Sequence, residues 1–462
     1  MDESVKRKMV EIELHSTSSD DDEYTKLVRR MNPPRVVIDN DACEHATLIK
    51  VDSINRHGIL LEVVQFLTDL DLVISKAYIS SDGEWFMDVF HVIDNGGNKI
   101  QDEDTLNYIQ KSVEAKACFQ SSIRKSCDKQ YTLIELTGSD RPGLLSEICA
   151  VLSDLGYNVV DAEIWTHNGR AAAIFHVNRI EEPSQLYMVK ELLYNVLKGS
   201  FDFRIPRITI SSVGVIHRGR RLHQMFYDDR DFEKPEVLNY STSSPHVTIL
   251  DCCDRDYTVV TIRSEDRPKL FFDILCTLTD MEYLVFHGTV ISGRMEAYQE
   301  YYIRHVDGLP ISSEAEQQRV IDCLEAAIQR RATEGLELDL CTDDRFGLLA
   351  DITRIFRENG LWVRRAEIST MNGKVKDSFL VTDVSGDLVD TKIVDSIRRQ
   401  VGQTTLQVKG SLNLPPKLIP ETSGSFLFRK LFKGGSFQNF KLVKSYSIVD
   451  LQKSLSTKVM EI

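Results

Sequence analysis

The sequence predicts an α+β protein that contains one small domain four times. In residues 131–177, an alternating strand pattern leads into a tight turn, a helical pattern and two further strands. The same succession recurs at 46–92, 257–306 and 336–384. A second helical pattern follows each copy, so the repeat has the length of a small domain and not of a solenoid unit.

The turn of the second copy, Ser139–Leu145, joins its first strand to its first helix. Asp140 is suited to cap the first helical turn, and Pro142 is tolerated there because the first amides of a helix have no partner within it. Gly143 leaves bare backbone at the helix start. Exposed amides and the helix dipole favour an anion such as a carboxylate at this place.

The remaining elements recur in the same order. Hairpin turns are expected at Asp82-Gly83, Asn168-Gly169 and Asn372-Gly373. Second helices are expected at Thr105–Ala115, Ser184–Leu197, Ser313–Arg331 and Asp390–Val401. The clearest last strands are Phe203–Ile210 and Thr404–Lys409. The order strand, helix, strand, strand, helix, strand specifies an antiparallel sheet with both helices on one face, the ferredoxin-like βαββαβ arrangement.

The strand, the turn with Asp140-Arg141-Pro142-Gly143-Leu144-Leu145 and the helix together resemble the ACT domain, a small-molecule-binding module of many amino-acid-metabolism proteins. Four copies in register over residues 46–410 resemble the plant ACT domain repeat (ACR) family. The copies are also similar to the regulatory ACT modules of the bacterial uridylyltransferase that senses glutamine. The resemblance implies a non-enzymatic regulatory protein that binds a free amino acid, glutamine-like ligands included, and senses amino-acid status.

The patterns divide the chain into seven parts. We expect a disordered N-terminus at 1–34, ACT domain 1 at 35–125, ACT domain 2 at 126–210, a linker at 211–256, ACT domain 3 at 257–332, ACT domain 4 at 333–410 and a basic, aromatic C-terminal tail at 411–462. Short blocks of opposite charge predict that the linker is exposed. Because only this connection is long, and because edge pairing removes open sheet edges, we expect domain 1 beside domain 2 and domain 3 beside domain 4.

The resemblance also implies where a ligand binds. ACT modules usually pair side by side and hold ligands at the seam, near the strand-to-helix turn. A ligand carboxylate would then meet the helix start, an aspartate would accept from its ammonium group, and an arginine would assist unless it is simply solvated. The candidate ligand-binding residues are Asp140, Arg141, Gly143, Leu144, Asp344, Arg345, Gly347 and Gly58.

The four turns are not equivalent. Lys269 replaces the glycine in the third copy, so its side chain would crowd a ligand, and we expect this copy to be structural. The first copy keeps Gly58 but has Asn55 in place of the aspartate and lacks the proline, whereas the fourth has Phe346 for the proline. The second copy is therefore the preferred site and the fourth the next. The alternative to a ligand site is a structural adaptor whose ACT pockets have decayed. In such a protein the turns would serve only as stable helix starts.

Composition and motifs argue against other classes of protein. The net charge of −14 disfavours general nucleic-acid binding. The nine cysteines contain no C-x-x-C, so neither a disulfide framework nor a zinc site is indicated. Phosphate-loop, metalloprotease, nucleophile-elbow and dinucleotide-binding motifs are all missing. We therefore expect no enzymatic activity, no cofactor and no metal.

The two ends of the chain bear on location. The N-terminus lacks an apolar signal core and is rich in acidic residues, which predicts a cytoplasmic protein and leaves entry to the nucleus open. Basic residues outnumber acidic ones in the tail, and phenylalanines alternate with them between Phe426 and Lys444. Peripheral membrane contact is one interpretation, and packing on the protein's own acidic surface is the other.

Overall fold

The computed structural model describes residues 35–82, 85–117, 131–198, 204–211, 217–233, 245–251, 256–293, 296–331, 334–402 and 405–409. The predictions for the N-terminus at 1–34 and for the tail at 411–462 lie outside these residues, as does Gly83 of one predicted hairpin turn. The Asn168-Gly169 and Asn372-Gly373 turns are confirmed, since all four residues have the positive φ that a tight hairpin turn requires.

Repeats 2 and 4 fold in the predicted βαββαβ order. The elements of repeat 2 are β5 (Tyr131–Ser139), α5 (Leu144–Asp154), β6 (Val159–His167), β7 (Arg170–Asn178), α6 (Pro183–Leu197) and β8 (Arg207–Ser211). Those of repeat 4 are β13 (Leu336–Asp343), α10 (Leu348–Glu358), β14 (Leu361–Met371), β15 (Lys374–Asp383), α11 (Thr391–Val401) and β16 (Leu406–Lys409).

Repeats 1 and 3 take their edge strand from the chain before the unit and not from the chain after it. The elements of repeat 1 are β1 (Arg35–Asp39), β2 (Thr47–Ile54), α3 (Ile59–Asp69), β3 (Val73–Ser80), β4 (Trp85–Ile93) and α4 (Glu103–Ala117). Those of repeat 3 are β9 (His246–Asp251), β10 (Thr258–Glu265), α8 (Leu270–Asp280), β11 (Tyr283–Ser292), β12 (Glu296–His305) and α9 (Glu314–Gln329). The edge position needs only an antiparallel neighbour, so a strand from either side of the unit can fill it.

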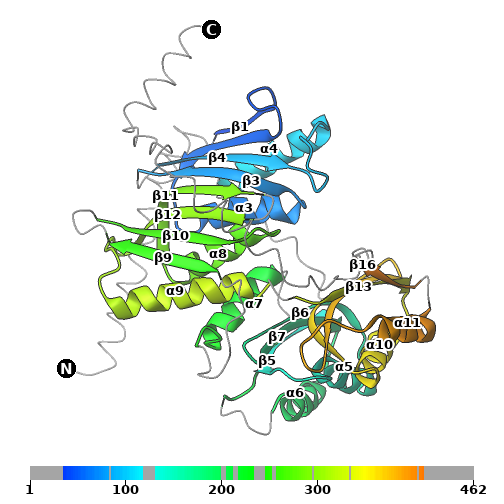
Figure 1. The fold of residues 1–462 in the computed structure, drawn as a ribbon. Helices are drawn as coiled ribbons and strands as arrows, with labels where there is room; N and C mark the ends of the chain where they lie inside the picture. The colour runs from blue at the N-terminus through cyan, green and yellow to red at the C-terminus, as the bar shows by residue number, and fades with distance from the viewer. Residues whose placement is uncertain are drawn as a thin grey trace, which may run out of the picture. The chain divides into compact units, whose positions relative to one another are not determined.

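The repeats pair side by side, as predicted, but with different partners (Figure 1). One eight-stranded sheet has the order β1-β2-β4-β3-β11-β12-β10-β9, and the other β16-β13-β15-β14-β6-β7-β5-β8. Repeat 1 therefore pairs with repeat 3, and repeat 2 with repeat 4. The expected pairing of 1 with 2 and of 3 with 4 is wrong. The length of the connections does not determine which repeats pair, because the side chains of the two partners must also fit together at the seam.

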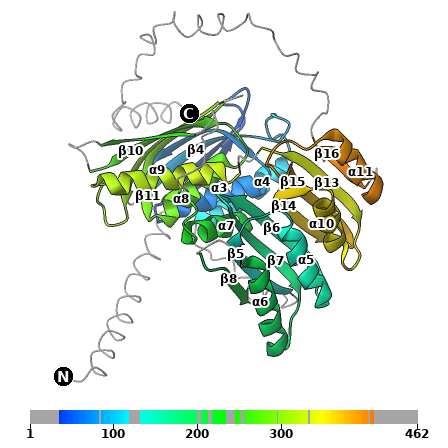
Figure 2. The same cartoon turned by 60° about the horizontal axis from the view of Figure 1, so that its bottom comes forward.

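Each seam joins two cores as well as two strands. At one seam β3 pairs with β11, and at the other β6 pairs with β14, both antiparallel. Buried apolar side chains of repeats 1 and 3 form one continuous core, and those of repeats 2 and 4 form a second. The first helices of the paired repeats meet across each seam, α3 with α8 and α5 with α10 (Figure 2). Burial of apolar area is thus shared between repeats that are far apart in the sequence.

The predicted linker is not an exposed connection over its whole length. It contains the helix α7 (Arg218–Asp228) and the strand β9. Leu222, Met225 and Phe226 of α7 pack on Trp165 and its neighbours on β5 and β7. These strand residues alternate with those that face α5 and α6, so α7 covers the opposite face of the sheet. The prediction failed because the charges around α7, as described below, are paired inside the protein.

Candidate ligand site at the sheet seams

All four strand-to-helix turns have the same backbone conformation. The residue before each first helix is left-handed, with φ of 82° at Gly58, 81° at Gly143, 63° at Lys269 and 74° at Gly347. Glycine adopts this conformation freely, whereas a lysine does so at some cost. The sequence alignment of the four turns is therefore correct, Lys269 included.

The arginine of each turn binds the acid six positions further on. In the second repeat, Arg141 donates from Nη1 to Glu147 Oε1 at 2.8 Å and from Nη2 to the other oxygen at 2.5 Å. Equivalent pairs join Arg56 to Glu62, Arg267 to Asp273 and Arg345 to Asp351. Arg141 and Arg345, predicted to assist a ligand, thus brace their own helix starts. The spacing of arginine and acid was visible in all four copies of the sequence.

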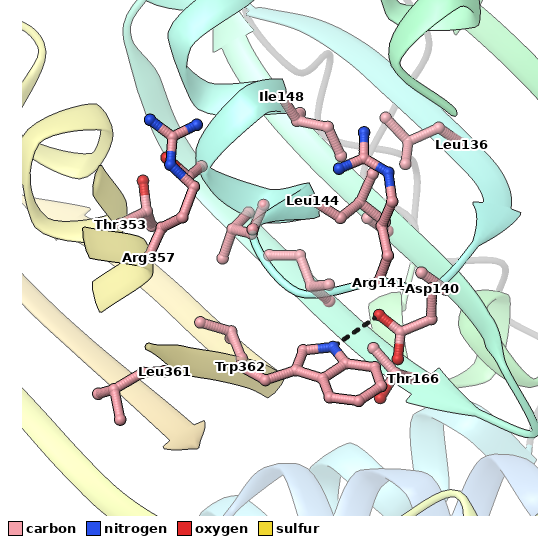
Figure 3. Close-up of a pocket in the computed structure, with 17 residues that line it drawn as sticks. Leu136, Asp140, Arg141, Leu144, Ile148, Thr166, Thr353, Arg357, Leu361 and Trp362 are labelled. Atoms are coloured by element: carbon pink, nitrogen blue, oxygen red, sulfur yellow. Dashed lines mark hydrogen bonds between the residues drawn. The ribbon is translucent and has the colours of Figure 1, made fainter. Parts of the chain in front are cut away.

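A small cavity lies at the turn of the second repeat, where we expected the preferred site (Figure 3). Gly143 and Leu144 at the start of α5 form one side. Arg357 and Trp362 of the fourth repeat form the other, so the site is built by both partners of the seam. The cavity measures about 20 Å³, which is room for about one water molecule.

Asp140 lines this cavity, and its side chain is only 3% exposed. It accepts a hydrogen bond from Trp362 Nε1 at 3.1 Å (Figure 3). It accepts another from Arg364 Nη1 at 3.2 Å, and the Arg364 guanidinium stacks on the Trp362 ring. Burial raises the pKa of Asp140 to about 6, against the opposing effect of the Arg364 charge.

The residues of the fourth repeat that complete this site were not among the predicted site residues. Arg357 lies directly over Gly143, because a Cβ added to that glycine would stand 2.8 Å from Arg357 Cδ. Trp362 and Arg364 come more than two hundred positions after Asp140. The tryptophan and two arginines at the start of β14 could have suggested a polar site, but only the correct pairing of repeats shows which residues they contact.

The remaining predicted residues lie at other turns. Asp344 donates its backbone amide to Gly373 O at 2.9 Å, as Asp140 does to Gly169 O at 2.8 Å. Gly347 stands at the second turn of the same seam, near Ser153, where an added Cβ would approach Oγ to 3.3 Å. Gly58 belongs to the other seam, near the side chain of Thr279. The structure thus brings Asp140, Arg141, Gly143 and Leu144 to one cavity and places the other four candidates elsewhere.

A larger cavity, of about 230 Å³, lies at the turn of the third repeat. Asp266, Arg267 and Lys269 line it from repeat 3, and Thr68 and Asn95 line it from repeat 1. Burial raises the pKa of Asp266. The third turn was expected to be structural because of Lys269, yet it lines the roomier of these two seam cavities.

The described part of the chain holds no sign of a metal site, a disulfide or a membrane-spanning helix. No group of histidine, cysteine, aspartate or glutamate side chains there could hold a metal ion. The described cysteines are free thiols. No helix in the described ranges is both long and apolar enough to cross a membrane.

Four small domains, each an antiparallel sheet of four strands with two helices, have their first helix starts at shared seams and define a protein of repeated ACT domains. Residues 42–120 match the ACR family N-terminal ACT domain, and residues 132–188 match the ACT domain. The ACT domain-containing protein ACR6 of Arabidopsis thaliana is 61% identical over 401 residues, which cover 84% of this chain and 92% of that protein. The chain belongs to the ACR family of ACT domain-containing proteins.

The chain is also similar, at lower identity, to three further proteins. ACR4 of Arabidopsis thaliana is 56% identical, over 92% of this chain and 98% of that protein. A bifunctional uridylyltransferase/uridylyl-removing enzyme of Gluconobacter oxydans is 27% identical over 44% of this chain but only 20% of that enzyme. The regulatory subunit of Thermus thermophilus aspartate kinase superposes with 12% identity over 44% of this chain and 94% of that subunit, at a TM-score of 0.15.

Proposed function

We propose that this protein is a non-enzymatic sensor of amino-acid status that binds a free amino acid at the seams between its ACT domains. One observation supports this most directly. A helix start without a side-chain cap at Gly143 and a buried carboxyl group at Asp140 converge on one cavity that two different repeats line.

The chemistry of the repeat-2 site suits the two ends of an amino acid. The first amides of α5 and the positive end of its dipole favour a carboxylate. Asp140 would accept from the ammonium group in exchange for its bonds to Trp362 and Arg364. Entry requires the Arg357 side chain to leave Gly143, because the cavity has room for only about one water molecule. Binding would therefore change contacts between repeats 2 and 4.

A structural adaptor is the second candidate, and one observation favours it. The acceptor oxygens of Asp140 are already engaged by residues of the same chain, and the cavity is nearly filled. An adaptor would keep this seam closed permanently. The two candidates differ in whether any amino acid stabilises the folded protein.

We predict that one or more of the twenty amino acids raises the melting temperature and that Gly143→Lys abolishes the effect. A ligand at about 100 times its dissociation constant stabilises by about 2.7 kcal/mol. Lysine at 143 would fill the space below Arg357. Lys269 shows that lysine is tolerated in the same backbone conformation.

Gly156→Lys is the matched control for this experiment. Gly156 has φ of 83° at the other end of the same helix, and nothing lies within 4 Å of an added Cβ. It therefore imposes the same backbone strain without touching the cavity, and its ligand response should equal that of the wild type. An unchanged response in Gly143→Lys would place the ligand elsewhere, and no response to any amino acid in the wild type would favour the adaptor.

We further propose that the sensor acts in the cytoplasm, with entry to the nucleus, and that its basic tail contacts anionic membrane surfaces. Both proposals rest on the sequence, and a fluorescent fusion checks the first. Deletion of residues 415–462 should abolish sedimentation with acidic vesicles while barely changing the melting temperature. A loss of several degrees with unchanged sedimentation would instead mean that the tail stabilises the folded protein.

A further inference from the structure

Asp273, the acid of the third turn, has a different environment from its three equivalents. The side chains of Glu62, Glu147 and Asp351 are all more than a third exposed. Asp273 is fully buried, and besides Arg267 at 2.7 Å it accepts from His223 Nε2 at 2.8 Å and from Arg331 Nε at 2.9 Å. The acid that braces the third turn therefore also binds α7 through His223.

His223, as a neutral imidazole, links Asp273 to Arg330. Its Nε2–H donates to Asp273, while its Nδ1 accepts from Arg330 Nη1 at 2.9 Å. Burial lowers the pKa of His223 to about 4, so the ring is uncharged at neutral pH. A neutral ring can donate on one side and accept on the other, and both of its nitrogens are then satisfied.

The residues after α7 carry the connection to the second repeat. Arg330 donates to both carboxylate oxygens of Asp231, at 2.8 and 2.6 Å. Asp231 also bonds His167 Nδ1 at 2.8 Å, and its carbonyl accepts from Asn168 Nδ2 at 2.8 Å. Asp229 binds Arg170 twice, at 2.6 and 3.1 Å. The end of α7 thus holds the hairpin turn between β6 and β7 from both sides.

That hairpin turn supports the repeat-2 site. Gly169 at its tip accepts the backbone amide of Asp140 at 2.8 Å, and Thr166 beside His167 lines the cavity. A series of buried or partly buried polar contacts, continued by the backbone of the hairpin turn, therefore runs from Arg267, at the larger seam cavity, to Asp140, at the smaller one.

We propose that this α7 network couples the two seams, so that occupancy of the cavity at the third turn changes binding at the second turn. The proposal rests on the proposed function, because it assigns regulation to those sites. Arg267 is suited to start the coupling: it lines the larger cavity, and its buried Nε–H has no acceptor among the described residues. A carboxylate there would draw Arg267 from Asp273 and disturb the contacts that Asp273 makes with α7.

Arg267→Gln imitates that withdrawal without any ligand, and hydrogen exchange of the full-length protein tests the result. We expect the amides of Asp140 and of residues 167–170 to exchange at least about fivefold faster, the lower end of usual coupling strengths. Arg56→Gln is the matched control, since Arg56 braces the equivalent turn of repeat 1, in the same core, through the partly exposed Glu62. It should leave these amides unchanged.

Because coupling is reciprocal, Asp231→Asn should accelerate exchange at residues 266–270, and this variant tests the proposal even if Arg267→Gln does not fold. The hairpin turn at 372–373, which is equivalent to Asn168-Gly169, gives the internal reference. Equal acceleration there would show general destabilisation and overturn the coupling. Acceleration confined to the residues around the substituted position, with none at the other turn, would also overturn the coupling. Neither hydrogen-exchange measurement needs a ligand. Failure of the coupling and failure of amino-acid binding are therefore observed in separate experiments.

Discussion

Replacing Asp231 with alanine should lower the free energy of unfolding by about 3–5 kcal/mol, the usual cost of removing one partner of a buried ion pair. Asp231 is fully buried and Arg330 is 2% exposed. The Arg330 guanidinium holds the pKa of Asp231 well below its usual range, so the carboxylate is charged. Without it, Arg330 would keep a buried charge with no carboxylate beside it, and His167 would lose its partner. Urea unfolding at neutral pH measures the loss.

Asp351→Ala is the control for this prediction. Asp351 also binds two arginines, Arg345 at 2.7 Å and Arg354 at 3.2 Å, but all three side chains are more than a third exposed. Water screens such pairs, so we expect a cost below about 1 kcal/mol. Equal costs for the two variants would mean that water reaches Asp231 in solution and that the α7 network is weak.

Local signals in the sequence predicted the repeat unit well. The turn of each copy could be aligned because strand alternation stops and helical spacing begins at the same point. The alignment placed Lys269 beside Gly58, Gly143 and Gly347, and all four have positive φ. Asn168-Gly169 and Asn372-Gly373 likewise form hairpin turns, because few other residue pairs adopt that backbone.

Long-range features could not be predicted in this way. The pairing of repeat 1 with 3 depends on side chains of two strands that fit only in three dimensions. The charges from Arg218 to Asp231 read as a solvated connection, because a charged residue looks the same in sequence whether water or a buried partner surrounds it. Trp362 and Arg364 were overlooked as part of the candidate site for the same reason: their partner, Asp140, lies in another repeat.

The contribution of the buried carboxyl group of Asp88 to the stability of the protein should fall as the pH rises from 5 to 8. The side chain is 1% exposed on the helix-covered face of β4, where Ser80 N donates to it at 3.3 Å. Burial raises its pKa from 3.8 to about 8. Between pH 3.8 and about 8 the folded state therefore retains a proton that the unfolded state has released. Such a group costs about 1.4 kcal/mol of unfolding free energy for each pH unit between the two pKa values, or about 4 kcal/mol over this range.

Asp88→Asn removes the ionisation but keeps an oxygen that can accept from Ser80. The equivalent position of repeat 3 is the buried Gln299, so an amide is compatible with this place in the sheet. Urea unfolding at pH 5, 6, 7 and 8 measures the free energy of unfolding of both proteins. The value for the variant should rise relative to that of the wild type by about 1.4 kcal/mol for each pH unit, because the effects of the other titrating groups cancel in the comparison. Asp41→Asn, at an exposed aspartate, should stay parallel to the wild type. Parallel curves for Asp88→Asn would mean that Asp88 is ionised in the folded protein throughout this range.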